Sequence, residues 1–340
     1  MPPASQRLRV LLPDQLLYFD KLVEALRDHG CDVVQASERD TERINALLPE
    51  IDIIVSLPRF GVTAEMIGKA PRLRAINSIV IGTDTIDVDA CTEAGIIVGN
   101  GAIPENYLGM AEAAVMLIVA LLKDMRRKEQ AMRQGQFRPP TMKARLVRGK
   151  TIGLIGLGRI GRGVVDRLQG WEVSIIAHDP FLPSDTSVPG VELVGLEELL
   201  RRSDVVSIHT PMTKQTRGLL GANELALMQP TAYLINTARG GIVDEQALAD
   251  ALAAGTIAGA AVDVFTQEPP PPDNPLLHVD PERIMLTGHN IGHGLEQQPK
   301  FLEAAVQNIL REAEGELPLY VVNPEAEPRW RERLARLGGR

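Results

Sequence analysis

Short apolar runs alternate with amphipathic stretches along most of the 340-residue chain. In the first hundred residues, the apolar runs Leu8–Leu12, Ile51–Ser56 and Leu73–Asn77 are typical of buried parallel strands. Helical patterns such as Asp20–His29 lie between them. Alternation of this kind predicts a doubly wound α/β unit. This first unit has no glycine-rich phosphate motif, so we interpret it as a substrate-binding or cap domain.

A glycine-rich motif opens the clearest part of the chain. The apolar run Thr151–Ile155 leads into Gly156-x-Gly158-x-x-Gly161, a helical pattern follows, and a β-branched run then ends on Asp179. In such a unit the three glycines permit a tight turn, the approach of a pyrophosphate and close helix packing, and the helix N-terminus attracts the phosphates. Asp179 would accept hydrogen bonds from the adenosine ribose and repel a 2′-phosphate, which predicts NAD rather than NADP. The alternative is an ordinary glycine turn followed by a strand-end aspartate.

The order of these elements predicts two domains. A long helix is expected from Asn106 to about Arg133, and strands continue to Leu286. A last helix over 296–314 precedes an apolar segment, Leu319–Val322, that we expect to rejoin the first unit. The predicted fold class is therefore α/β, with two Rossmann-like doubly wound parallel-sheet domains: a discontinuous substrate domain (1–103 and 296–324), an NAD-binding domain (104–295) and a frayed, charged C-terminal tail (325–340).

Composition narrows the function classes. The chain is 44% hydrophobic and 24% charged, as in soluble globular proteins, and its net charge of −8 argues against a nucleic-acid surface. Cys31 and Cys91 are too few for a disulfide framework and lack metal-ligand spacing, so we expect a reducing compartment and no metal. The longest apolar run, Ala113–Leu122, is about half a membrane span, and no secretory signal is evident. A cytoplasmic protein with no membrane partner is expected.

Three later stretches place chemically useful side chains after predicted strands, where ligands of doubly wound sheets bind. Arg239 follows one strand, and a guanidinium can bind a carboxylate through two parallel hydrogen bonds. Glu268 precedes four prolines that fix its backbone. His289 ends another strand and suits proton transfer near neutrality, although His293 is a competitor. A carboxylate beside that histidine would stabilise the imidazolium.

These motifs together resemble the D-isomer-specific 2-hydroxyacid dehydrogenases. The resemblance rests on the glycine motif, Asn236-Thr-Ala-Arg239-Gly-Gly, Val262-Asp-Val-Phe…Glu268-Pro and Leu286-Thr-x-His289, and it extends from about Val55 to Asn323. It implies two Rossmann-like domains, NAD as cofactor, a 2-oxo or 2-hydroxy acid substrate, and a homodimer formed through the cofactor domain.

The resemblance also implies roles for individual residues. Arg239 would bind the substrate carboxylate and polarise the keto group, His289 would be the acid–base, and Glu268 its partner. Substrate contacts would come from Ile81, Gly82, Asn106 and Arg239. Cofactor contacts would come from Gly156, Gly158, Arg159, Ile160, Gly161, Asp179, His209, Thr210, Pro211, Thr216, Thr237, Ala238, Arg239, Asp263, His289 and Gly292.

The expected reaction interconverts a 2-oxo acid and a D-2-hydroxy acid, as in hydroxypyruvate or glyoxylate reductases or in phosphoglycerate dehydrogenases. The sequence departs from the family at Gly288, where proline commonly precedes the histidine. The loop Leu57–Val62, which would select the substrate, has no readable code.

Three alternatives remain. Ser56-Leu57-Pro58, Ile81-Gly82 and Asn106 also resemble formate dehydrogenases, but those pair the histidine with glutamine where this chain has Glu268. A phosphite dehydrogenase would need its substrate lysine at Ile81. Corepressors of the C-terminal-binding-protein type keep the fold and bind NAD while acting mainly through partners.

Overall fold

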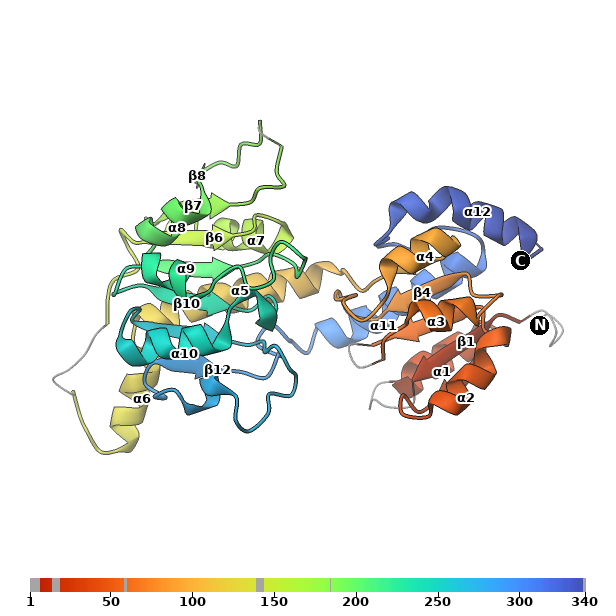
Figure 1. Cartoon of the computed structure of the whole chain (residues 1–340), viewed down its shortest axis with the longest axis horizontal. Helices are drawn as coiled ribbons and strands as arrows, with labels where there is room; N and C mark the ends of the chain where they lie inside the picture. The colour runs from red at the N-terminus through yellow and green to blue at the C-terminus, as the bar shows by residue number, and fades with distance from the viewer. Residues whose placement is uncertain (1–6, 14–18, 58–59, 139–143, 184, 339–340) are drawn as a thin grey trace. The chain divides into compact units, whose positions relative to one another are not determined.

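The chain divides into two compact α/β units (Figure 1). The computed structural model describes residues 7–13, 19–57, 60–138, 144–183 and 185–338. The first unit comprises Met1–Asn106 and Gly294–Arg340, and the second comprises Tyr107–His293. The two boundaries between the units lie within three residues of the predicted ones, whereas the tail predicted as a separate part, 325–340, belongs to the first unit. Two parallel-sheet domains confirm the predicted fold class.

The first unit is a five-stranded parallel sheet in the order β2-β1-β3-β4-β5. Two of its three inner strands, β3 and β4, are buried along their whole length, as expected for apolar runs covered on both faces. The elements are β1 (Arg9–Pro13), β2 (Asp32–Ala36), β3 (Ile53–Ser56), β4 (Ala75–Ser78), β5 (Ile97–Gly99), α1 (Phe19–Asp28), α2 (Thr41–Leu47), α3 (Ala64–Gly68), α4 (Val88–Ala94), α11 (Gln297–Ala313) and α12 (Glu327–Arg336).

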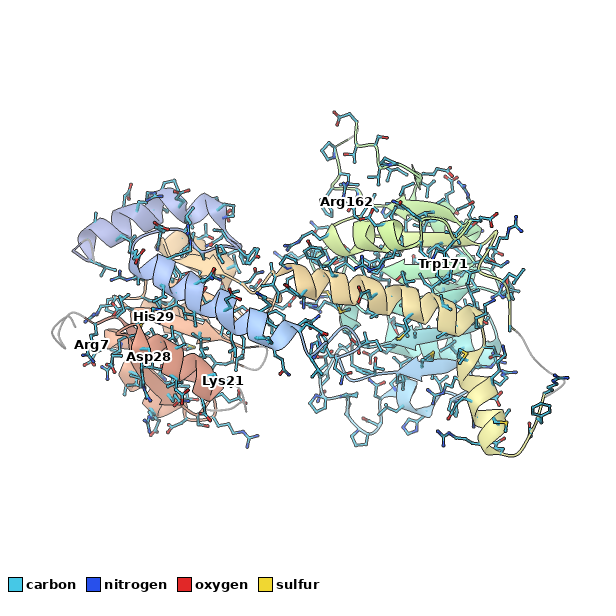
Figure 2. The ribbon with its side chains drawn as sticks, turned by 180° about the vertical axis from the view of Figure 1, so that it is seen from behind. Arg7, Lys21, Asp28, His29, Arg162 and Trp171 are labelled. Atoms are coloured by element: carbon cyan, nitrogen blue, oxygen red, sulfur yellow. The ribbon has the colours of Figure 1, made fainter. Side chains whose placement is uncertain are left out.

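The second unit is a seven-stranded parallel sheet in the order β12-β11-β10-β9-β6-β7-β8. Helices α8, α9 and α10 supply the core of one face, and α5 and α7 supply the other, where Figure 2 shows them side by side. The elements are α5 (Pro104–Leu122), α6 (Met125–Arg133), β6 (Thr151–Ile155), α7 (Arg159–Arg167), β7 (Ser174–His178), β8 (Val191–Leu193), α8 (Leu196–Arg202), β9 (Val205–Ile208), α9 (Ala222–Leu227), β10 (Tyr233–Asn236), α10 (Glu245–Ala254), β11 (Gly259–Val262) and β12 (Ile284–Leu286).

The prediction of a single long helix from Asn106 to about Arg133 is wrong, because the structure contains two helices there. Asp124 adopts a left-handed conformation, with φ of +54°, which ends α5 and begins α6. By length and composition α5 could cross a membrane, but its inner face, including Leu117 and Ile118, packs into the core of the second unit. Core helices of soluble proteins share this property.

The C-terminal segment is a helix, so the predicted frayed tail is also wrong for the residues described. Trp330 is fully buried, and its indole N–H donates to the carbonyl of Arg74 at 2.9 Å. The guanidinium of Arg333 donates to the carbonyls of Leu73 and Ala94. These contacts make helix α12 part of the first unit. The helix can pack there because its few apolar side chains recur at helical spacing on one face. The predicted return of the chain is confirmed by the antiparallel bridge between Gly99 and Val321.

Helix α11 carries a carboxyl group into the core of the first unit. Glu312 is fully buried, and its Oε2 accepts a hydrogen bond from the side-chain amide of Asn77 at 2.5 Å. Burial raises the pKa of Glu312 to about 8, although the hydrogen bond from Asn77 and the positive charge of the nearby Arg74 each lower this pKa. The folded protein therefore favours the neutral carboxylic acid at pH 7.

Glu312 predicts a pH dependence of stability. Its pKa in the folded protein lies above the ordinary value of 4.5. The contribution of the neutral carboxyl group to the free energy of unfolding is therefore fully present below pH 4.5 and is lost as the pH rises through about 8. The loss is at most about 1.4 kcal/mol per pH unit. We expect Glu312→Gln, which stays neutral, to gain thermal stability relative to the wild type between pH 6 and pH 8.5. Parallel melting-temperature profiles for the two proteins would contradict this assignment.

Candidate active site

Three loops of the second unit meet because they follow adjacent parallel strands. In the sheet register Asn236 pairs with Val262, and Val262 pairs with Leu286. The loops after β10, β11 and β12 therefore leave the same edge of the sheet. These loops carry Arg239, Glu268 and His289, the three residues predicted to be catalytic.

The histidine and the glutamate are in direct contact. His289 Nδ1 lies 2.6 Å from Glu268 Oε2, and the other carboxylate oxygen accepts the backbone N–H of Phe265 at 3.0 Å. His289 also has a φ of +57°, a conformation uncommon for a residue with a Cβ and frequent at functional sites. His293 is exposed, and no hydrogen bond of its side chain occurs among the described residues. The geometry therefore favours His289 over His293 as the residue paired with the carboxylate.

The Arg239 loop is shaped by its neighbours. The side chain of Asn236 donates to the carbonyl of Arg239 at 2.9 Å and accepts the N–H of Ala238 at 3.1 Å. A Cβ at Gly240 would lie 1.9 Å from the backbone carbon of Phe265, so only glycine permits this contact. The loop that carries Arg239 consequently packs on the loop that carries Glu268.

Asp263 organises the segment around His289. Its buried carboxylate accepts hydrogen bonds from the hydroxyl of Thr287 at 2.6 Å and from the N–H of Asn290 at 3.1 Å, while its carbonyl accepts the N–H of His289 at 2.7 Å. The sequence predicted a contact of Asp263 with the cofactor, and the structure shows this supporting role. The supporting roles of Asn236 and Thr287 were missed, although both are polar residues at the ends of apolar strands.

The glycine turn fits a dinucleotide. Gly156 has a φ of +97°, and a Cβ there would lie 2.8 Å from the backbone of His209. A Cβ at Gly161 would lie 2.4 Å from the carbonyl oxygen of Gly156. Nothing lies within 4 Å of the Cβ position of Gly158, which leaves the backbone open to an approaching pyrophosphate. Arg159 and Ile160 follow in the first turn of α7, with the Arg159 guanidinium 5.7 Å from the ring centre of Tyr107.

Asp179 lies beside this turn. One carboxylate oxygen accepts the N–H of Leu157 at 2.9 Å, and the other accepts the N–H of Phe181 at 3.1 Å. Each oxygen can accept a second hydrogen bond. The carboxylate is therefore fixed at the end of β7, where the sequence places the adenosine ribose, and it retains the capacity to bind it.

The segment from His209 to Thr216 follows β9 and lies beside the glycine turn, at the carboxyl ends of the parallel strands. The hydroxyl of Thr216 donates to the carbonyl of Pro211 at 2.7 Å, and Thr210 N is close to the Cβ position of Gly156. Burial lowers the pKa of His209 to about 4, so this imidazole is neutral at pH 7. Its Nε2 and the hydroxyl of Thr237 are buried without partners in the described part of the chain. Unpartnered buried polar atoms at this edge fit a polar ligand such as NAD.

The remaining predicted residues have mixed surroundings. Gly292 packs against α5, since a Cβ there would lie 2.1 Å from the sulfur of Met110. Ile81, Gly82 and Asn106 belong to the first unit, and the buried side-chain oxygen of Asn106 has no partner among the described residues. In the loop Leu57–Val62, residues 58 and 59 lie outside the described residues.

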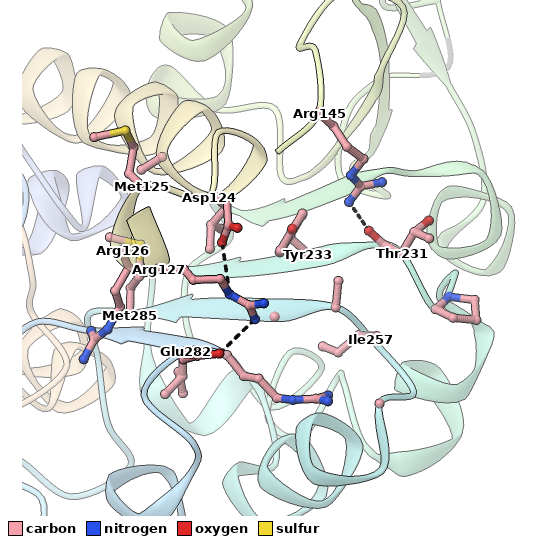
Figure 3. A pocket seen from close by; sticks show the side chains of 18 residues that line it. Asp124, Met125, Arg126, Arg127, Arg145, Thr231, Tyr233, Ile257, Glu282 and Met285 are labelled. Atoms are coloured by element: carbon pink, nitrogen blue, oxygen red, sulfur yellow. Dashed lines mark hydrogen bonds and ion pairs between the residues drawn. The ribbon is translucent and has the colours of Figure 1, made fainter. Parts of the chain in front are cut away.

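A cavity of about 370 Å³ lies elsewhere in the second unit (Figure 3). It is lined by the first residues of β10, β11 and β12, at the edge opposite His289. Inside it, Arg127 forms ion pairs with Asp124 and Glu282 (Figure 3). The catalytic candidates do not line this cavity.

Comparisons with known proteins agree with the geometry. Residues 115–290 match the family model described as the NAD-binding domain of the D-isomer specific 2-hydroxyacid dehydrogenases. A glyoxylate reductase from Thermofilum pendens is 38% identical over 87% of this chain and 89% of its own length. A D-3-phosphoglycerate dehydrogenase from Archaeoglobus fulgidus is 35% identical over 91% of this chain, which spans 58% of that longer protein.

A solved structure shows the same architecture. The D-lactate dehydrogenase from Aquifex aeolicus, determined with NAD and lactic acid, matches with a TM-score of 0.83 and 27% identity, covering 92% of this chain and 98% of the other. The chain therefore belongs to the D-isomer specific 2-hydroxyacid dehydrogenase family, and its second unit contains the family's NAD-binding domain.

Proposed function

We propose that this protein is an NAD-dependent dehydrogenase that interconverts a small 2-oxo acid and the corresponding D-2-hydroxy acid. The observation that carries the proposal is the contact between His289 and Glu268, on the same sheet edge as Arg239 and the glycine turn. The relatives named glyoxylate reductase and D-3-phosphoglycerate dehydrogenase support the substrate class. Glyoxylate, hydroxypyruvate and phosphohydroxypyruvate are therefore the first substrates to test.

The chemistry follows from the positions of three side chains. NADH, when bound, supplies a hydride to the keto carbon. With Nδ1 held by Glu268, His289 presents Nε2 for donating a proton to the keto oxygen, and it accepts that proton in the reverse direction. Glu268 stabilises the protonated imidazole. The guanidinium of Arg239 binds the substrate carboxylate and stabilises negative charge on the reacting oxygen.

Substitution of the two competing histidines tests this assignment. We expect His289→Gln to lower kcat for the 2-oxo acid by about a hundred- to ten-thousandfold, the usual contribution of a general acid–base. The matched control His293→Gln should stay within about twofold of the wild type, because that exposed side chain contacts no carboxylate. Steady-state NADH oxidation measures both variants, and NADH fluorescence titration shows whether cofactor binding is kept. A large loss in His293→Gln with normal turnover in His289→Gln would reverse the assignment.

Coenzyme choice depends on Asp179. Repulsion between its carboxylate and a 2′-phosphate at hydrogen-bond range should favour NADH over NADPH by roughly five- to a thousandfold in kcat/KM. We expect Asp179→Asn, which keeps the shape and an acceptor for Leu157, to narrow this ratio mainly through KM. Equal use of NADPH by the wild-type protein would exclude this role.

We further propose a homodimer formed through α5, α6 and the described residues that follow them, 134–138 and 144–146. Six exposed large apolar side chains lie there: Leu108, Met116, Met125, Met132, Phe137 and Leu146. Met125 also lines the cavity beside α6, so that cavity borders the same surface. Six large apolar side chains exposed within one continuous stretch of chain support an interface there.

Sedimentation velocity tests the dimer. The wild-type protein should sediment at twice its chain mass of 37.0 kDa. Combining Met132→Glu with Phe137→Glu should favour the monomer, because an interface would then bury two unpaired charges. The control Leu277→Glu, at an exposed apolar residue elsewhere on the second unit, should remain dimeric. A monomeric wild-type protein, or a dimer unaffected by the double substitution, would contradict the proposal.

A further inference from the structure

Three successive carbonyl groups of the first unit are held by the unit itself. The carbonyl of Val80 accepts the N–H of Gly101 at 3.0 Å. The carbonyl of Ile81 accepts the side-chain amide of Asn100 at 2.9 Å, and the carbonyl of Gly82 accepts the hydroxyl of Ser78 at 2.7 Å. This short loop therefore turns its oxygen atoms toward the framework formed by the ends of β4 and β5.

Peptide geometry fixes what the loop presents on its other side. In a planar trans peptide the carbonyl of one residue and the N–H of the next point in opposite directions. The N–H groups of Ile81, Gly82 and Thr83 consequently point away from the framework. No acceptor for these three N–H groups occurs among the described residues. Successive backbone N–H groups of this kind form a site suited to an anion such as a carboxylate.

Asn100 is itself held by a chain of hydrogen bonds. Its N–H donates to the carbonyl of Tyr320 at 3.0 Å, and its carbonyl accepts the side-chain amide of Asn308 at 3.2 Å. Asn308 lies on α11 with only 1% of its surface exposed, and its side-chain oxygen accepts the N–H of Leu319 at 2.8 Å. Asn308 uses both the amide and the oxygen of its side chain, so that side chain is not free to rotate. The backbone of Asn100 is held through both its N–H and its carbonyl, which fixes the position from which its side-chain amide reaches the loop.

We propose that Asn100, fixed in place by Asn308, is a positioning residue for substrate binding. By holding the carbonyl of Ile81, it aims the N–H group of Gly82, in the same peptide, at the carboxylate of the 2-oxo acid. The neighbouring N–H of Ile81 is set by the hydrogen bond between the carbonyl of Val80 and Gly101. The inference rests on the proposed function, which supplies that carboxylate. Asn100 acts only through the loop, so it takes no part in hydride or proton transfer.

This role predicts a particular kinetic signature. The carboxylate keeps its charge through the reaction, so contacts with it stabilise the substrate and the transition state equally and are expressed in KM rather than in kcat. We expect Asn100→Ala to raise KM for the 2-oxo acid about tenfold, the effect of losing one ordinary hydrogen bond. Both kcat and KM for NADH should stay within about twofold. Asn100→Asp, which keeps the shape but replaces the donor with an oxygen, should raise the same KM at least as much.

A buried asparagine with a different target provides the matched control. Asn323 is fully buried and hydrogen-bonds Val98, Thr92 and Ile96, but it contacts no residue of the loop 80–82. Asn323→Ala should destabilise the first unit without raising KM for the 2-oxo acid. Hydrogen–deuterium exchange of the peptide covering 79–86 should become faster in Asn100→Ala and Asn308→Ala, but not in Asn323→Ala.

The exchange measurement separates the two proposals. If the wild-type protein reduces no 2-oxo acid, the proposed function fails, while exchange still tests whether Asn100 and Asn308 hold the loop. If the wild-type protein turns over but the Asn100 variants keep a normal substrate KM, only the positioning role is overturned. A fall in kcat alone, or an equal rise in KM for NADH, would also overturn it.

Discussion

The buried carboxylate of Asp263 is the interaction on which the arrangement at the second unit's active edge depends. A buried negative charge is costly unless hydrogen bonds replace its hydration, and this one is satisfied by Thr287 and by backbone N–H groups that follow His289. Its own N–H donates to the carbonyl of Asn236, and its carbonyl accepts the N–H of His289. One residue thus joins the three neighbouring strand ends that carry the arginine, the glutamate and the histidine.

This support explains how His289 holds an unfavourable backbone conformation. A residue with a Cβ at positive φ costs about 1–2 kcal/mol relative to an ordinary conformation. Gly288 immediately before it has no neighbour within 4 Å of its Cβ position, so the approach to the histidine is not fixed by packing at that point. The hydrogen bonds that the carbonyl of Asp263 and the carboxylate of Glu268 accept from His289 therefore fix both its backbone and its imidazole.

Much of this organisation is encoded locally and was predictable. Spacing in the sequence predicts the glycine motif, the apolar strands and the polar residues that follow them. Buried parallel strands must be apolar, and ligands bind beyond the carboxyl ends of those strands. The break at Asp124 was missed because no glycine or proline marks it and good helix-forming residues continue on both sides, although the apolar run ends at Leu122. The buried Trp330 was missed because the tail is dominated by charge, although Trp330 and Leu334 are spaced for one face of a helix. The contact of Asn308 with Asn100 joins residues 208 positions apart and leaves no local signal.

The two units use a common physical device to present backbone N–H groups to anions. At the glycine turn, Asp179 accepts the N–H of Leu157 and Arg162 donates to the carbonyl of Leu157, so the next peptide, which carries the N–H of Gly158, is fixed before any ligand arrives. In the loop 80–82, Asn100 and Ser78 fix the carbonyls in the same way. In both places the surrounding residues hydrogen-bond the carbonyl of a peptide, and this fixes the direction in which the N–H of the same peptide points. Anion binding then requires little reordering of the backbone, which lowers the entropic cost of binding.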